Sequence, residues 1–376
     1  MVYPPPEPTC NSLQNEHAGC DTLRSVSSSD KRKQPLGITY DKQVRHRQER
    51  DSNIELLRIV CMVMILVLHT FVGPEKIDNL LGTTVFVYFR NSFCIPAVDM
   101  FVLTSGYFSI RWKIRSLRSL VIQVYFFVFI TYLAAYIFRL ALPSVSVYQI
   151  LWDAFNALVK GYWFITAYLV LYLIAPVLNK YTEQIDKKSL GMMLLIYFIA
   201  MTYYALNGVK DSIGFNSVFL FIFLYLTGRY IRMFVDEKSL HTLHLLWIYL
   251  LLTVFVTVEA IVCKMFMNDG TCNYVIRGGT YSNIFVVGQA VTGFLFFKSL
   301  KIKSRFINYI GASALAVYLL HMAPGLKLSY YGLAAKISNE PFVMQQVYTV
   351  ILVSAAFVLA IVLDKIRLAI FYKYSK

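Results

Sequence analysis

The chain has 376 residues, of which 57% are hydrophobic, 16% are aromatic and only 15% are charged, and its mean hydropathy is +0.56. This composition excludes an ordinary soluble enzyme, because soluble domains carry roughly 25% charged residues. The formal net charge of +15 would favour a nucleic-acid ligand in a soluble protein. Here we attribute it to basic loops on the cytosolic side of membrane helices and expect no nucleic-acid partner.

Residues 1–52 are rich in proline, serine and charged side chains and lack a sustained apolar face. Such a segment cannot bury enough apolar surface to fold, so we predict a disordered, basic, cytosolic tail. It contains no apolar core of a secretory signal. We expect the first membrane helix to act as the insertion signal.

Apolar runs of around 20 residues then recur to near the C-terminus, and each can cross a hydrocarbon core of about 30 Å as a helix. Backbone groups in lipid must pair internally, so long runs without alternation predict helices. The fold class we predict is all-α, a polytopic transmembrane bundle over residues 53–371, with an amphipathic interfacial helix near 145–160. The predicted spans are 54–73, 84–109, 119–142, 163–179, 189–207, 215–233, 244–267, 281–299, 306–325 and 344–370.

The orientation follows from the basic residues of the loops. With the N-terminus in the cytosol, the inner loops and the C-terminus hold eighteen Lys and Arg residues, and the outer loops hold seven. The bias has the same sign in every successive loop pair. The positive-inside rule therefore favours an even number of spans with both termini in the cytosol, in a multi-pass protein of the plasma membrane.

Ionisable side chains inside the predicted spans are costly and mark functional candidates. On the first span, Arg58 and His69 are eleven residues apart, which places them about 20° apart around the helix axis and roughly 16 Å apart along it. His69 and His321 each lie about fifteen residues into spans that enter from the cytosol, so we expect them at a similar depth. The whole set is Glu55, Arg58, His69, Arg90, Asp99, Arg139, Glu259 and His321.

Structural explanations compete with the functional ones. A single intramembrane histidine can serve as a helix-to-helix hydrogen bond, and Arg58 can snorkel to the interface or pair with Glu55 at i,i+3. We interpret Arg90 and Arg139 as anchors or acceptor contacts. Cys263 and Cys272 flank the outer end of the seventh span, where they are either two thiols or a disulfide.

Several segments resemble the acyltransferase family 3 of integral-membrane O-acyltransferases of bacterial surface glycans. "IELLRIVCMVMILVLH" is similar to the family's opening helix, which carries an Arg and a His with ten residues between them, as Arg58 and His69 have here. "VDMFVLTSGYF" resembles the second-helix segment, although the family more often has a second Phe there. "RSLR" matches a cytosolic Arg-x-x-Arg pair. "GYWFITAYLVLYLIAPVLNK" and "IGASALAVYLLH" resemble two further family segments, and the resemblance covers about residues 53–370.

The resemblance implies transfer of an acyl group, usually acetyl, from acyl-CoA to a hydroxyl of a cell-surface polysaccharide or glycolipid precursor. On this interpretation His69 is the general base, Arg58 orients the donor, and His321 positions His69 or the acceptor. Arg115 and Arg118 bind the phosphates of acyl-CoA. A transient acyl-enzyme is an alternative mechanism. Candidates for contacts along the passage or with the acceptor are Asp99, Ser105, Tyr107, Trp163 and Glu259.

We expect no bound cofactor and no metal, because the six histidines are scattered and form no ligand cluster. Acyl-CoA would be a donor substrate, and the expected partners are membrane lipid, acyl-CoA and a carbohydrate or lipid-linked glycan acceptor. The alternative function is a proton-coupled transporter or glycan flippase, which intramembrane His, Glu and Arg would also suit. Transporters often contain inverted repeats, and the sequence shows none.

Overall fold

A computed structural model describes residues 51–70, 83–138, 146–156, 158, 161–206, 215–236, 240–266 and 281–371. Contacts within the chain separate Met1–Gln48 from Glu49–Lys376, and all of the described residues belong to the second unit. Residues 1–50 of the predicted tail, Arg139 and Cys272 lie outside the described residues, whereas Ser52 already belongs to the first helix.

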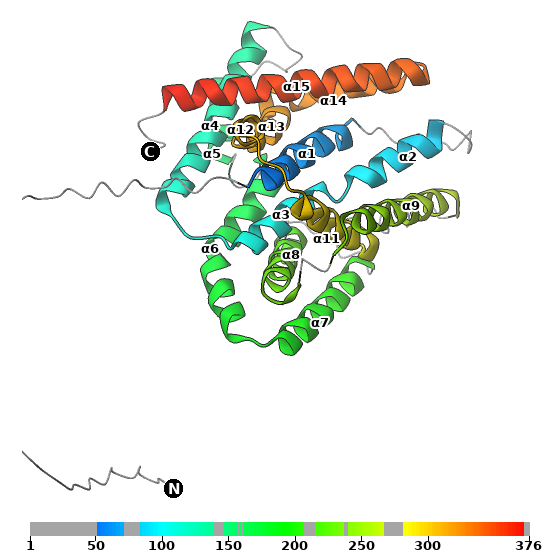
Figure 1. Ribbon diagram of the computed structural model, residues 1–376. Coiled ribbons are helices and arrows are strands. Elements are labelled where there is room, and N and C mark those ends of the chain that lie inside the picture. Colours follow the sequence, from blue (N-terminus) through cyan, green and yellow to red (C-terminus); the bar gives the residue numbers. More distant parts are fainter. Residues whose placement is uncertain are drawn as a thin grey trace, which may run out of the picture. The chain divides into compact units, whose positions relative to one another are not determined.

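Every regular element of the described residues is helical, as predicted (Figure 1). Each of the ten predicted spans contains at least one helix, and the amphipathic segment forms α5. The helices are α1 (Ser52–Leu68), α2 (Thr83–Cys94), α3 (Ala97–Phe108), α4 (Ile114–Ile137), α5 (Val147–Asn156), α6 (Trp163–Gln184), α7 (Lys187–Leu206), α8 (Phe215–Phe234), α9 (Thr242–Phe266), α11 (Ile284–Ser299), α12 (Arg305–Gly311), α13 (Ala314–His321), α14 (Pro324–Ser338) and α15 (Phe342–Ile370).

Six helical segments of the described residues are long and apolar enough to cross a membrane, which supports a multi-pass membrane protein. α2 and α3 together form one of them, interrupted before Ala97 by Pro96, which has no backbone N–H to donate. The shorter apolar helix α11 also falls on a predicted span. The total of ten spans and the cytosolic placement of both termini stay predictions.

The predicted ninth span, 306–325, differs from the structure. The helical segment Arg305–His321 ends there, and α14 begins at Pro324. The axes of the two segments differ in direction by 81°. Proline at the first helical position favours such a new start. The prediction missed α14 because its lysines and serines dilute the apolar pattern.

α1 occupies the interior of the bundle, where it contacts α2, α3, α11, α12, α13 and α15. α3 and α8 approach each other most closely at Gly106 and Gly228, where a Cβ atom on either glycine would overlap the backbone of the other helix. Small residues allow this backbone contact between membrane helices. α3 is therefore held closely against α8, and α1 with its C-cap and α3 carry five of the ten predicted site residues.

Candidate active site

A pair of histidines joins the end of α1 to the end of α13. The Nδ1 atom of His69 lies 2.8 Å from the Nε2 atom of His321, and the Nδ1 atom of His321 lies 2.6 Å from the carbonyl oxygen of Val317. His321 is buried, and the two ring centroids are 5.0 Å apart. The structure thus brings together two side chains that are 252 residues apart in the sequence.

These contacts determine the tautomer of each ring in the neutral pair. A carbonyl oxygen only accepts, so the Nδ1 atom of His321 carries the proton and donates to Val317. The Nε2 atom of His321 is then an acceptor, so the Nδ1 atom of His69 must donate to it. This leaves the Nε2 atom of His69 without a proton. This Nε2 atom of His69 is therefore a hydrogen-bond acceptor and a base.

Tyrosines surround the histidine pair and hold its position. The ring centroid of Tyr331 lies 5.8 Å from that of His69, and the rings of Tyr330 and Tyr318 lie 5.4 and 5.9 Å from that of His321. The hydroxyl of Tyr330 also donates to the carbonyl of Leu66 at 3.0 Å and so ties α14 to α1. The histidines therefore sit in a tightly packed aromatic environment.

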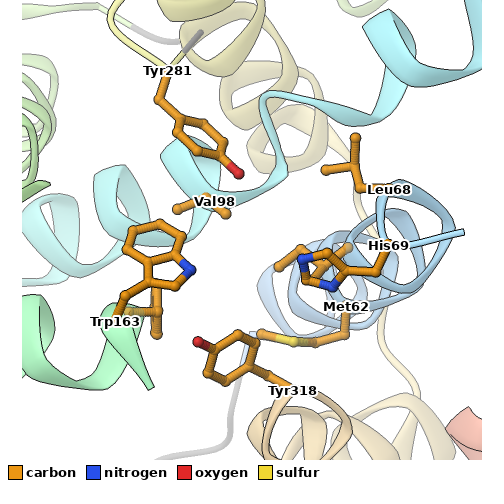
Figure 2. Close-up of a pocket in the computed structure, with 9 residues that line it drawn as sticks. Met62, Leu68, His69, Val98, Trp163, Tyr281 and Tyr318 are labelled. Carbon is orange, nitrogen blue, oxygen red and sulfur yellow. The ribbon is translucent and has the colours of Figure 1, made fainter. Parts of the chain in front are cut away.

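A pocket opens beside His69 (Figure 2). Figure 2 shows the imidazole facing a space that Trp163 and Tyr281 border from the other side. The indole and the Tyr281 ring are 5.9 Å apart by centroid. His69 is the basic side chain among the lining residues, which are Met62, Ile65, Leu68, His69, Val98, Trp163, Phe164, Tyr281 and Tyr318. This pocket presents a base to a space lined by aromatic and aliphatic side chains.

Arg58 lies on the same stripe of α1 but does not line this pocket. Its Nη1 atom donates to the Oε1 atom of Glu55 at 2.9 Å, so the predicted i,i+3 pair is present. The arginine also lies within electrostatic range of Tyr168, whose hydroxyl is 3.3 Å from the Oγ atom of Ser105. Tyr168 therefore contacts Ser105 and lies within the electrostatic influence of Arg58, nearer the start of α1 than the histidines.

Asp99 is fully buried in α3, next to the pocket-lining residue Val98. Neither of its carboxylate oxygens has a hydrogen-bond partner among the described residues, and Tyr281 lies within its electrostatic range.

Glu259 does not line the pocket and instead accepts two hydrogen bonds from the Asn283 side chain at 2.9 and 2.8 Å. Asn283 caps α11, so Glu259 has a structural contact just after Tyr281.

The remaining predicted residues lie apart from the histidine pair. Arg115 and Arg118 are exposed in the first turns of α4, and Tyr107 is buried at the end of α3. Arg90 donates to the Gln346 side chain at 3.2 Å.

Cys263 is buried, and the disulfide alternative stays a prediction because its partner position is outside the described residues. In the described part of the chain, no group of three His, Cys, Asp or Glu side chains could hold a metal ion.

Sequence reasoning missed four aromatic residues of this region: Tyr281, Tyr318, Tyr330 and Tyr331. Tyr318 and Tyr330 lie three residues before and nine residues after His321, so helical spacing could have placed Tyr318 beside it. Tyr330 and Tyr331 depend on the bend before α14. No local pattern marks Tyr281, which lies just before the N-cap of α11.

The chain was compared with known proteins. A family model described as an acyltransferase domain matches residues 51–365, and it is the model of acyltransferase family 3. No curated protein and no solved structure matches the chain. The match covers most of the described residues, including the histidine pair, the pocket and Arg58.

Proposed function

The chain belongs to acyltransferase family 3, and from this premise we propose that it moves an acetyl group from acetyl-CoA to a hydroxyl of a cell-surface polysaccharide or glycolipid precursor. Family membership and the apolar helices make it a multi-pass membrane acyltransferase. The donor, the acyl group, the acceptor and the plasma-membrane location are our proposals. The observation that carries them is the hydrogen-bonded chain from Val317 through His321 to His69.

In the proposed mechanism, the Nε2 atom of His69 accepts the proton of the acceptor hydroxyl while that oxygen attacks the thioester carbonyl. The carbon–sulfur bond breaks as the new carbon–oxygen bond forms, and the proton on His69 passes to the departing thiolate. Throughout, the Nδ1–H of His69 donates to His321, which stabilises the transient imidazolium. His321 is thus a positioning residue, and the aromatic walls exclude water.

The donor is proposed to enter at the end of the bundle where α1 and α4 begin. Arg115 and Arg118 are exposed there, and guanidinium groups bind phosphate through two parallel hydrogen bonds. Arg58 lies further along α1 and would orient the pantetheine arm or the thioester. Met62 and Ile65 continue the same helical stripe from Arg58 to His69 and line the pocket. On this proposal, Arg58 and the base His69 share one face of α1.

The test is a labelling reaction with purified protein, radiolabelled acetyl-CoA and a surface-glycan fraction. We expect label in the glycan, and we expect His69→Ala to reduce labelling at least about 100-fold at unchanged expression. Labelling that survives the substitution would remove His69 from the mechanism. Proton-coupled uptake of a glycan without any labelling would favour the transporter alternative.

A further inference from the structure

Two basic side chains converge on the buried ring of Tyr107 at the end of α3. The Nη1 atom of Arg232, from α8, donates to the Tyr107 hydroxyl at 3.0 Å, and its guanidinium carbon is 5.2 Å from the ring centroid. The Nζ atom of Lys298, from α11, is 5.7 Å from the same centroid. The two cations are therefore no more than about 11 Å apart. Tyr107, a predicted passage or acceptor contact, thus has two cations beside its ring.

No described carboxylate forms a salt bridge with either cation, whereas three other arginines of the described helices have acidic partners. Arg229, one turn earlier on α8, donates to Thr182 and Ser109 and lies 4.0 Å from Glu183. Arg58 and Arg367 also have acidic partners, Glu55 and Asp364. Arg232 and Lys298 instead leave positive charge available beside an aromatic anchor.

The support beneath these two cations is rigid. Tyr107 is only 2% exposed, and its ring packs against Phe294 at 5.0 Å between centroids. Next to it, Gly106 and Gly228 bring the α3 and α8 backbones into contact, and Gly228 is one turn before Arg232. A charged group that is held by packing loses less conformational freedom when it binds a ligand.

The same end of the bundle carries the start of α4. Residues 109–113 link Tyr107 to α4, and side chains of α6 and α8 hold this link. The hydroxyl of Tyr225 accepts from the Ile110 backbone N–H at 3.1 Å, Asn179 donates to the Ile110 carbonyl at 2.9 Å, and the Tyr172 hydroxyl accepts from the Lys113 N–H at 2.8 Å. The first turn of α4, with Arg115, is thus fixed relative to Tyr107.

We propose that Arg232 and Lys298, anchored on Tyr107, form a second phosphate-binding site for the acyl-CoA donor, separate from the Arg115 and Arg118 pair. Coenzyme A carries phosphate at two places, the pyrophosphate linkage and the 3′-phosphate of its ribose. One pair of cations can hold each of them. The guanidinium supplies two parallel donors and the ammonium supplies a point charge. This inference rests on the proposed function, because it requires acyl-CoA as the donor.

The experiment measures binding of coenzyme A and of dephospho-coenzyme A, which lacks the 3′-phosphate, to purified protein in nanodiscs of neutral lipid. The test variant is R232Q/K298Q. The matched control is K187Q/K188Q, which removes two exposed lysines from the start of α7. A parallel arm uses nanodiscs with anionic lipid, and melting temperatures confirm that each variant is folded. Arg232→Lys, which keeps the charge but loses the planar fork, is a second variant.

We expect R232Q/K298Q to weaken coenzyme A binding at least about ten-fold, and the control to leave it unchanged, because charge-assisted hydrogen bonds are lost. We expect Arg232→Lys to have an intermediate affinity. A loss seen only with coenzyme A assigns the site to the 3′-phosphate, and a loss shared with dephospho-coenzyme A assigns it to the pyrophosphate; both support the proposal.

Wild-type affinity in both R232Q/K298Q and Arg232→Lys would overturn the inference and leave the proposed function intact. An effect confined to nanodiscs with anionic lipid would assign the pair to a lipid headgroup and would also overturn it. If the wild-type protein binds no coenzyme A in any nanodisc, the proposed function fails, and this inference fails with it.

Discussion

The two ends of the α1–α3 core use opposite physical means to present reactive or binding groups. Around His69 and His321, a half-buried and a buried imidazole lie among tyrosines, and a short chain of hydrogen bonds fixes their orientation. Around Tyr107, cations are exposed or half-buried and rest on a rigid aromatic support. The first end is suited to proton transfer without water, and the second to capture of an anion from water.

The comparison also shows what a substitution at each end should affect. Loss of a buried hydrogen-bond partner leaves a polar group unsatisfied and disturbs the geometry of its neighbour. Loss of an exposed cation removes attraction for an anionic ligand and leaves the packing intact. Variants of the histidine end should therefore change kcat, and variants of the cationic end should change KM for the donor.

After removal of His69 itself, we expect substitution of His321 to lower activity most. His321→Ala removes the acceptor for the Nδ1–H of His69, so we expect kcat to fall about 10- to 100-fold with KM for acetyl-CoA unchanged, because a small misplacement of a catalytic group costs up to about 100-fold. His321→Gln retains an amide oxygen that can accept this hydrogen bond, and it should recover part of the activity. Steady-state kinetics of the two variants check this, and equal loss in both would contradict a positioning role.

At the cationic end, R115Q/R118Q should raise KM for acetyl-CoA about ten-fold, because two guanidinium groups that could bind phosphate are lost. We expect kcat to change little, since these residues lie apart from the histidine pair. Initial rates over a range of acetyl-CoA concentrations measure both constants. A lower kcat at unchanged KM would show that the two ends do not divide their tasks in this way.

Stability provides a third comparison, between two glycines. Gly106→Ala places a methyl group against the backbone of Tyr225, so we expect it to destabilise the fold by roughly 1–3 kcal/mol. Gly332→Ala is the matched control, because no atom lies within 4 Å of its added Cβ, and it should stabilise α14 by about 0.5–1 kcal/mol. Thermal unfolding in detergent ranks the two variants. A Gly106→Ala protein as stable as wild type would contradict the close contact of α3 and α8.

The smallest effect is expected at Tyr331, whose ring contacts His69 from α14. Its hydroxyl contacts the Sδ atom of Met322 at 3.8 Å, which is a weak acceptor. Tyr331→Phe keeps the ring and should leave kcat within about two-fold of wild type, whereas Tyr331→Ala removes a ring contact of the kind worth about 0.5–1.5 kcal/mol and should lower it several-fold. Parallel assays measure both rates. A strong loss in Tyr331→Phe would instead assign the hydroxyl a direct role.

The helices were predictable because the membrane imposes long apolar runs, and all ten runs contain helix. Their similar depth in the spans predicts that His69 and His321 lie at one level, but depth alone could not show that they touch. That contact depends on how α13 packs against α1. The predicted link between Arg58 and the donor is untested, although the structure gives Arg58 a neighbour, Tyr168, that the sequence did not indicate.

Other features lay beyond sequence reasoning for identifiable reasons. The sequence does not predict α14, because Lys327, Ser329 and Lys336 interrupt its apolar pattern. The bend before α14 brings Tyr331 beside His69. Glu259 stays a predicted passage residue, and its contact with the Asn283 cap of α11 could not be predicted from its depth. The cationic pair on Tyr107 joins three helices that are distant in the sequence. Such convergence follows from packing, which local patterns do not encode.

The central claim is that the Val317 carbonyl, through His321, leaves the Nε2 atom of His69 free to act as a base. Nitrogen-15 NMR of histidine-labelled protein in lipid, with His69→Ala and His321→Ala spectra to assign the signals, measures the tautomer of each ring directly. We predict a proton on Nδ1 and none on Nε2 for both residues at neutral pH. A proton on the Nε2 atom of His69, with Nδ1 bare, would contradict the account.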